Sequence, residues 1–154
     1  MSGTVRERLL GAGLVLPDAP EALGSYVPAT RAGGLVFTAG QLPVREGSLL
    51  TSGTVDDRVP LTVAREAAAV AALNALAAAS TVCDLDAVER VVRLSGFVAS
   101  APGFDAQPAV VDGASDVLLS AFGDAGRHAR IAVGVTVLPK DAPVEVELVL
   151  ALRS

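Results

Sequence analysis

The chain has 154 residues and a formal net charge of −5 at pH 7, and 51% of its residues are hydrophobic although only 3% are aromatic. This acidic balance argues against a nucleic-acid partner, which would require a basic face to neutralise phosphates. One cysteine and one histidine exclude an internal disulfide and a cysteine-based zinc site, and the chain has no nucleotide-binding glycine motif, so we expect neither a metal nor an organic cofactor.

The first 20 residues are predicted to form a helical arm and a connector. Thr4 to Gly13 favours a short helix, and Leu16 to Pro20 favours a stiff connector with two prolines. Glycines interrupt the apolar stretch behind the charged N-terminus, which makes it a poor secretory signal. We therefore expect a cytoplasmic protein in which residues 1–154 form a single domain.

Short extended segments come next. Ser25–Ala32 and Leu35–Ala39 are predicted to pair across the Gly33-Gly34 turn, because this dipeptide favours two-residue hairpins. Glu46–Val55 is predicted to be a further short strand or a loop.

An alanine-rich helix follows, with Thr62 as its N-cap and its end near Thr81. Its longest apolar run, Ala67–Ala79, is shorter than the roughly 18 residues of a membrane span, so we expect no membrane partner. Val88–Ser100 is predicted to be a strand, and Val110–Phe122 a second helix.

The last quarter of the chain alternates in polarity with period two, as strands do. Every second residue is apolar over 129–137, and the same pattern returns over 144–152. We predict that these two segments form a closing hairpin with Val137 opposite Val144. The resulting order, β-β-β-α-β-α-β-β, predicts an α+β fold with a single sheet and two helices on one face.

Arg130 is the most informative residue of this segment. Small neighbours, Ala132 and Gly134, leave room beside its guanidinium, whose planar fork of donors fits a carboxylate. The alternative is that Arg130 forms a salt bridge at a subunit interface, because buried arginines are usually paired. In the predicted hairpin, Arg130 lies roughly 20 Å along the ladder from Glu145, so these charges either are unrelated or meet across a subunit boundary.

The apolar excess without aromatic residues indicates surface buried against partner subunits. The alternative is a compact alanine-rich monomer.

Several short motifs occur in an order that is typical of one family. They are Tyr26-Val27-Pro28, the run from Leu35 to Pro43, Ala129-Arg130, Leu138-Pro139-Lys140-Asp141 and Val144-Glu145-Val146-Glu147. With this ordered set, the chain resembles the RidA/YjgF family, also called L-PSP endoribonuclease-like, from about Tyr26 to Leu150.

The resemblance implies a chorismate-mutase-like fold assembled as a homotrimer, with ligand clefts between subunits. Arg130 matches the arginine that binds the substrate carboxylate, and Glu145 matches the glutamate that positions or activates the attacking water. Tyr26, Gly40 and Ala132 match the walls of the same pocket. The implied reaction is hydrolysis of an amino-acid-derived enamine or imine to a 2-keto acid and ammonia, with no cofactor.

The chain departs from the family pattern at several positions. His128 occupies the position, two residues before the arginine, where the family has a proline. Ile131 occupies the position after the arginine, where the family has a small residue, and Ala39 occupies the position of a family serine. The family's asparagine near the start of the second helix has no obvious match, and Asp112 and Asp116 are the nearest candidates. These departures indicate a divergent subgroup whose substrate need not be 2-aminoacrylate.

Other functions stay open beside imine hydrolysis. A non-catalytic trimer could bind a small carboxylate, such as a keto acid, or serve a regulatory role, because a fold does not fix a function. Glu145 would then be a solvated strand charge. Ribonuclease activity or translation inhibition is disfavoured by the acidic charge and the lack of a histidine pair.

Overall fold

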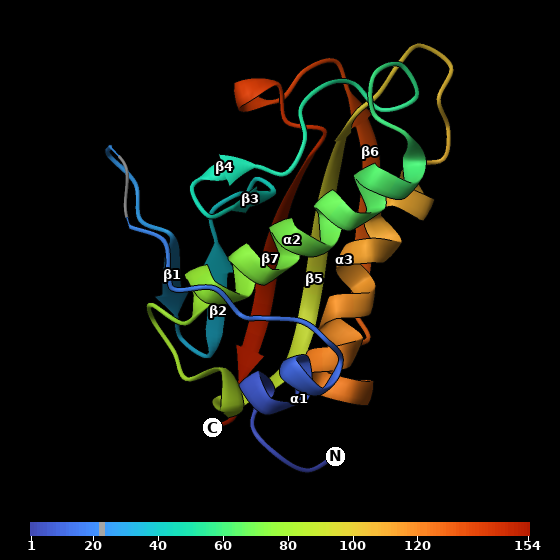
Figure 1. Ribbon diagram of the computed structural model, residues 1–154. Helices are drawn as coiled ribbons and strands as arrows, with labels where there is room; N and C mark the ends of the chain where they lie inside the picture. Colours follow the sequence, from blue (N-terminus) through green and yellow to red (C-terminus); the bar gives the residue numbers. More distant parts are fainter. Residues whose placement is uncertain (22–23) are drawn as a thin grey trace.

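The computed structural model describes residues 1–21 and 24–154, and its centre is a five-stranded mixed sheet covered on one side by helices (Figure 1). The strand order is β1-β2-β7-β5-β6. These strands are β1 (Ala29–Ala32), β2 (Leu35–Thr38), β5 (Val88–Ala99), β6 (Ala129–Val135) and β7 (Val144–Leu152). The predicted α+β architecture with the two longer helices on one face is confirmed.

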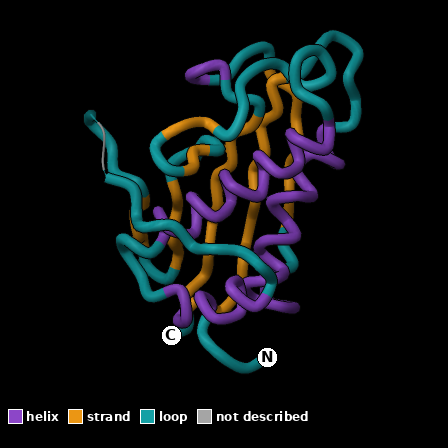
Figure 2. The backbone as a smooth tube through the Cα atoms, viewed as in Figure 1, coloured by secondary structure: helices purple, strands orange, loops and turns teal. Residues whose placement is uncertain are grey.

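The two long helices lie side by side in one layer in front of the strands (Figure 2). They are α2 (Leu61–Ala79) and α3 (Gln107–Phe122), with the short α1 (Val5–Gly11) packed against α3. Single 3-10 turns occupy Leu85–Ala87, Gly123–Gly126 and Pro139–Asp141.

Prolines explain why both long helices begin earlier than the sequence predicts. The residue before α2 is Pro60, in an extended conformation, so the helix begins at Leu61 and Thr62 lies in its first turn instead of capping it. Pro108 lies in the first turn of α3. A proline is tolerated there because the first N–H groups of a helix have no intrahelical acceptor.

The N-terminal hairpin forms as predicted, with Ala32 opposite Leu35 across the two glycines. The extended segment predicted within 46–55 does not join the sheet. Instead, β3 (Val44–Arg45) and β4 (Ser48–Leu49) form a separate two-stranded ribbon. The prediction of one sheet that includes this segment is therefore wrong.

The predicted closing hairpin is also wrong, because β5 lies between its two strands. Helix α3 carries the chain back so that β6 runs parallel to β5, with Arg130 opposite Leu94. β7 then pairs antiparallel with the other edge of β5, with Leu148 opposite Leu94, and joins β5 to β2. A long central strand offers two edges, and this arrangement places the apolar residues of β7 beneath α2.

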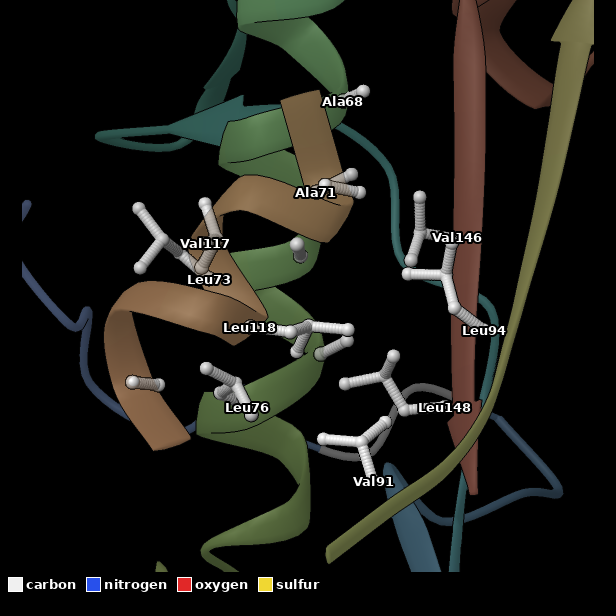
Figure 3. Packing of buried hydrophobic residues seen from close by; sticks show 14 of the residues in the cluster. Ala68, Ala71, Leu73, Leu76, Val91, Leu94, Val117, Leu118, Val146 and Leu148 are labelled. Atoms are coloured by element: carbon white, nitrogen blue, oxygen red, sulfur yellow. The ribbon is translucent and has the colours of Figure 1, made fainter. Parts of the chain in front are cut away.

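The hydrophobic core lies between the two long helices and the face of the sheet that they cover. Figure 3 shows leucines of α2 and α3, among them Leu76 and Leu118, facing Leu94 and Leu148 of the strands. Alanines on α2 and Gly113 of α3 allow the two helices to approach closely, because a side chain at Gly113 would collide with the backbone carbonyl of Arg65.

Helix α2 is long and apolar enough to cross a membrane by length and composition, but 61% of its apolar window is buried inside the protein. It is a core helix, and its hydrophobicity is accounted for by packing.

Among the described residues, no helix covers the opposite face of the sheet (Figure 1). Leu35, Phe37 and Val133 are 37%, 39% and 41% exposed, respectively, which is high for large apolar side chains. Phe97 of β5 lies opposite both Val133 of β6 and Glu145 of β7, so this open face also carries Phe97 and Glu145.

Candidate functional site

Glu145 lies near the beginning of β7, half-buried against the backbone at Gly40. A Cβ at position 40 would overlap the carboxylate of Glu145, so only glycine allows the carboxylate to occupy this position. The two segments are joined by backbone hydrogen bonds between Gln41 and Val146, of 2.8 and 3.0 Å. The β-bridge between these neighbours therefore holds Gly40 and Glu145 side by side.

Two features raise the pKa of Glu145. Burial is the larger cause because it disfavours the charged carboxylate, and the negative charge of nearby Glu147 adds to it. A carboxyl group with a raised pKa accepts a proton more readily at neutral pH than an ordinary surface glutamate does. Glu145 is thus suited to act as a base.

A cleft of about 520 Å³ opens beside this carboxylate. Its lining includes Tyr26, Gly40 and Glu145, so three of the predicted site residues meet there, together with Lys140 and Asn74. Asn74 donates two hydrogen bonds of 2.9 Å to the carbonyl groups of Leu42 and Val44, which fixes the wall of the cleft on α2. Lys140 and Asn74 were not predicted; only their position in the fold places them here.

Arg130 lies elsewhere, on β6, with its side chain directed at α3. Its Nη1 donates to Asp112 Oδ1 at 2.7 Å and to Ser115 Oγ at 3.2 Å, and Nη2 lies 3.5 Å from the carbonyl oxygen of Pro108. The side chain is 24% exposed. Asp112 is therefore the acidic partner of Arg130 within one chain, whereas the alternative from the sequence placed such a salt bridge at a subunit interface.

The other acidic candidate on α3, Asp116, belongs to a different ion pair. It accepts a hydrogen bond of 2.7 Å from Arg65 of α2. Of the two aspartates considered from the sequence, only Asp112 is next to Arg130.

His128 completes the cluster around Arg130. Its Nδ1 contacts the carbonyl oxygen of Gly126, and its Nε2 lies 3.0 Å from Ser115 Oγ. A carbonyl oxygen can only accept, so Nδ1 carries the proton in the neutral ring and Nε2 accepts from the Ser115 hydroxyl. The Ser115 oxygen is then free to accept from Arg130.

The sequence contained a signal for this cluster that our prediction missed. His128 and Arg130 are two residues apart at the entrance to one strand, and Asp112 and Ser115 are three apart on one helix. Each spacing places its two residues on a common side.

Arg130 and Glu145 lie on opposite faces of the sheet. The helix-covered face carries Arg130, which is in register with Leu94 of β5 and, across β5, with Leu148 of β7. Ala132, two residues further along β6 and opposite Gly96, lies on the same face. Glu145 is in register with Phe97 and points to the open face. From these registers, the two Cα atoms are about 14 Å apart, rather than the roughly 20 Å expected from a hairpin.

Within residues 1–21 and 24–154, no three His, Cys, Asp or Glu side chains gather in a way that could hold a metal ion. Cys83 is half-buried, and burial raises the pKa of its thiol, as expected for a packing residue rather than a nucleophile.

The family described as "YjgF/chorismate mutase-like, putative endoribonuclease" matches residues 6–152 of this sequence. The chain belongs to this family. The resemblance identified from the short motifs is confirmed, and it extends into the N-terminal arm. A relative from Trypanosoma cruzi, Protein TCP17, is 39% identical over 155 residues, which cover 99% of this chain and 97% of the relative.

Two solved structures show different degrees of similarity to this chain. The crystal structure of Atu1372 from Agrobacterium tumefaciens, a protein of unknown function, is 38% identical, with a TM-score of 0.89 over 98% of this chain and 94% of that one. TdcF from E. coli, solved with bound serine, is 26% identical, with a TM-score of 0.62 over 88% of this chain and 94% of that one. The larger structural difference from TdcF agrees with the departures seen in the sequence.

Proposed function

We propose that this YjgF-like protein hydrolyses a small imine or enamine derived from an amino acid, yielding a 2-keto acid and ammonia. The observation that carries the proposal is the half-buried carboxylate of Glu145, seated against Gly40 in the same cleft as Tyr26. The raised pKa of Glu145 suits a group that takes a proton from water.

The reaction requires little beyond this carboxylate and a clamp for the substrate. Water adds to the carbon of the protonated imine while the Glu145 carboxylate accepts one proton of the water, so the nitrogen becomes a neutral amine. Glu145 then returns that proton to the nitrogen. The carbon–nitrogen bond breaks as the carbonyl forms, and the proton released from the hydroxyl group leaves with ammonia as ammonium. Arg130 binds the substrate carboxylate and orients the imine carbon toward the water.

The position of Arg130 requires a second copy of the chain. Because Arg130 and Glu145 point to opposite faces, one chain cannot present both to a small substrate. We infer a homotrimer in which Arg130 and Ala132 of one subunit meet Glu145, Gly40 and Tyr26 of the next. The open sheet face, with Phe37 and Val133 exposed, suits burial against other subunits.

The test is an assay of ammonia or keto-acid release from imines generated in place by an amino-acid oxidase. We expect Glu145→Gln to lower turnover by roughly 10²- to 10⁴-fold, the usual contribution of a general base, with little change in ligand affinity. Glu147→Gln is the matched control, since Glu147 lies on the same face two residues along. Equal, small effects of both changes would contradict a catalytic role for Glu145.

A second function has a specific observation in its favour. Arg130 and Glu145 lie on opposite faces of the sheet, so within one chain the carboxylate-binding residue is separate from the base that turnover requires. In a cytoplasmic trimer that binds a small carboxylate without turning it over, Arg130 would bind the ligand and Glu145 would have no catalytic role. This second function would be favoured if the wild-type protein bound a small carboxylate but accelerated the hydrolysis of no imine from a broad panel of amino acids.

A further inference from the structure

The pairing of β2 with β7 is irregular at the point where the chain enters the cleft of Glu145. The regular pairing ends with Phe37 opposite Val149, and the next pair is Gln41 opposite Val146. Three residues, 38–40, therefore stand opposite two, 147 and 148. One extra residue on one strand of an antiparallel pair is a β-bulge, a device that redirects the side chains beyond it.

The side chain of Thr38 completes the ladder at this bulge. Its Oγ1 accepts a hydrogen bond of 2.9 Å from the N–H of Leu148. In an uninterrupted ladder this N–H would donate to the backbone carbonyl of residue 38, just as the N–H of Leu152 donates to the carbonyl of Gly34 at 2.8 Å. Thr38 is only 7% exposed, so removal of its hydroxyl would leave a buried N–H without this acceptor.

Backbone hydrogen bonds on both sides fix the extra residue. The N–H of Ala39 donates to the carbonyl of Pro28 at 2.7 Å, away from β7. Gln41 then resumes the pairing through its two hydrogen bonds with Val146. The bulge is therefore a defined structure rather than a loose end of the strand.

The bulge decides which face of the sheet Gly40 joins. Without the extra residue, Gly40 would stand opposite Val146, whose side chain is fully buried in the core. In the register of Gln41 and Val146, Gly40 stands opposite Glu147 instead, on the open face that carries Glu145. The missing side chain of Gly40 leaves the space that the Glu145 carboxylate occupies.

We propose that Thr38 is a positioning residue of the candidate site: its hydroxyl maintains the bulge that sets Gly40 against Glu145 and keeps this carboxylate half-buried. The inference rests on the proposed role of Glu145 as the base. Thr38 is not among the residues that line the cleft, so it acts through the backbone and does not contact the substrate.

The test is a direct measurement of the pKa of Glu145 by ¹³C NMR of the side-chain carboxyl, without substrate, in the full chain. Thr38→Val keeps the branched shape but removes the acceptor, so the Leu148 N–H would bond the backbone and draw the segment back into the regular register. We expect the pKa of Glu145 to fall toward that of an ordinary glutamate, because the carboxylate becomes more exposed. No ionisable group is added or removed, so the change reports burial.

Turnover gives a second readout. In Thr38→Val, kcat should fall by roughly 10- to 100-fold with little change in KM, since a displaced base orients water poorly but leaves substrate contacts intact. Thr38→Ser retains the hydroxyl and should restore both the pKa and kcat. Thr38→Ala removes the hydroxyl without placing a methyl group in its position, and it provides the same test if Thr38→Val does not fold.

Val36→Ala is the matched control. Val36 is fully buried on the same strand, two residues before Thr38, and its truncation should lower Tm by leaving a cavity. It should leave the pKa of Glu145 and kcat unchanged. The same change in pKa in this control would overturn the inference, because general loosening of the sheet would then explain it.

An unchanged pKa of Glu145 in Thr38→Val or Thr38→Ala would also overturn the inference, as would a failure of Thr38→Ser to restore it. If the pKa changes as expected while wild-type protein hydrolyses no imine, the positioning role of Thr38 stands and only the proposed reaction fails.

Discussion

Arg130 and Glu145 project from opposite faces of the same sheet, on strands separated by β5. Each is held by its own surroundings: Arg130 by Asp112 and Ser115 of α3, and Glu145 by the glycine at position 40. A small substrate can contact both only where two chains meet. This relationship allows the proposed assembly to be tested through activity as well as through mass.

The first prediction is that two inactive variants complement each other. Arg130→Ala and Glu145→Gln chains, co-expressed with different tags and purified as mixed trimers, should regain about one third of wild-type turnover. In a cyclic trimer with shared clefts, either mixed composition contains one site with both native residues. Each variant alone should stay inactive. Mixed trimers without activity would show that both residues act from the same subunit, and light scattering near 15.5 kDa would exclude a trimer altogether.

The second prediction concerns the pH dependence of turnover. The pKa of Glu145 is raised, first by burial and then by Glu147, so the ionised base is lost as pH falls through a value above that of an ordinary glutamate. We expect kcat/KM to fall on the acidic side around this raised pKa. Glu147→Gln should move the acidic limb to lower pH while leaving the plateau nearly unchanged. A limb that stays in place in this variant would contradict the assignment of the limb to Glu145.

The same raised pKa predicts a cost in stability, with a definite sign. A carboxyl whose pKa is higher in the folded than in the unfolded state favours folding while it is protonated. That contribution is lost as pH rises through the folded-state pKa. Glu145→Gln should therefore raise Tm at pH 7 and not at pH 3. An equal gain at both pH values would point to a packing effect instead of the ionisation of Glu145.

The sequence was sufficient for the fold class and for the elements that have strong local signals. The apolar positions of 88–100 marked β5 to within a residue, period-two alternation marked β7, and the glycine pair marked the first hairpin. Strand partners were harder to predict because alternation shows which residues share a side, but not which edge a strand joins. β6 and β7 are adjacent in sequence and have matching patterns, yet both pair with β5.

The site was predictable in the same uneven way. Motif order placed Tyr26, Gly40 and Glu145, which do meet in one cleft. The cluster of Arg130 with Asp112, Ser115 and His128 depends on how α3 lies across β6, and the spacing of these residues within each element does not show that the two elements meet. The proline and asparagine that the family pattern leads one to expect are replaced within this cluster, so the motif comparison was weakest there.

The fourth prediction tests the position of the Glu145 carboxylate, the proposed base. Gly40→Ala should lower turnover strongly, because a Cβ at this position overlaps the Glu145 carboxylate and forces it out of the cleft. The fold should survive, since a partly exposed carboxylate can move toward solvent. Gly34→Ala is a suitable control, as a Cβ there would lie 3.9 Å from the nearest atom, the carbonyl oxygen of Leu152. Full activity in Gly40→Ala would show that Glu145 does not need its observed position.

The last prediction concerns the packing of the two helices that cover the sheet. Gly113 of α3 lies so close to α2 that a Cβ would collide with the backbone carbonyl of Arg65, and backbone cannot move aside as a side-chain end can. Gly113→Ala should therefore destabilise the protein by about 1–3 kcal/mol in denaturant unfolding, as overpacking of a close-packed core does. Because α3 also carries Asp112 and Ser115, the separation of the helices should shift the partners of Arg130, and ligand affinity should fall with stability. Gly11→Ala, at the end of α1 with nothing within 4 Å of the added carbon, should change neither property. If Gly113→Ala lowered stability but left binding intact, the cluster around Arg130 would be held by β6 rather than by the position of α3.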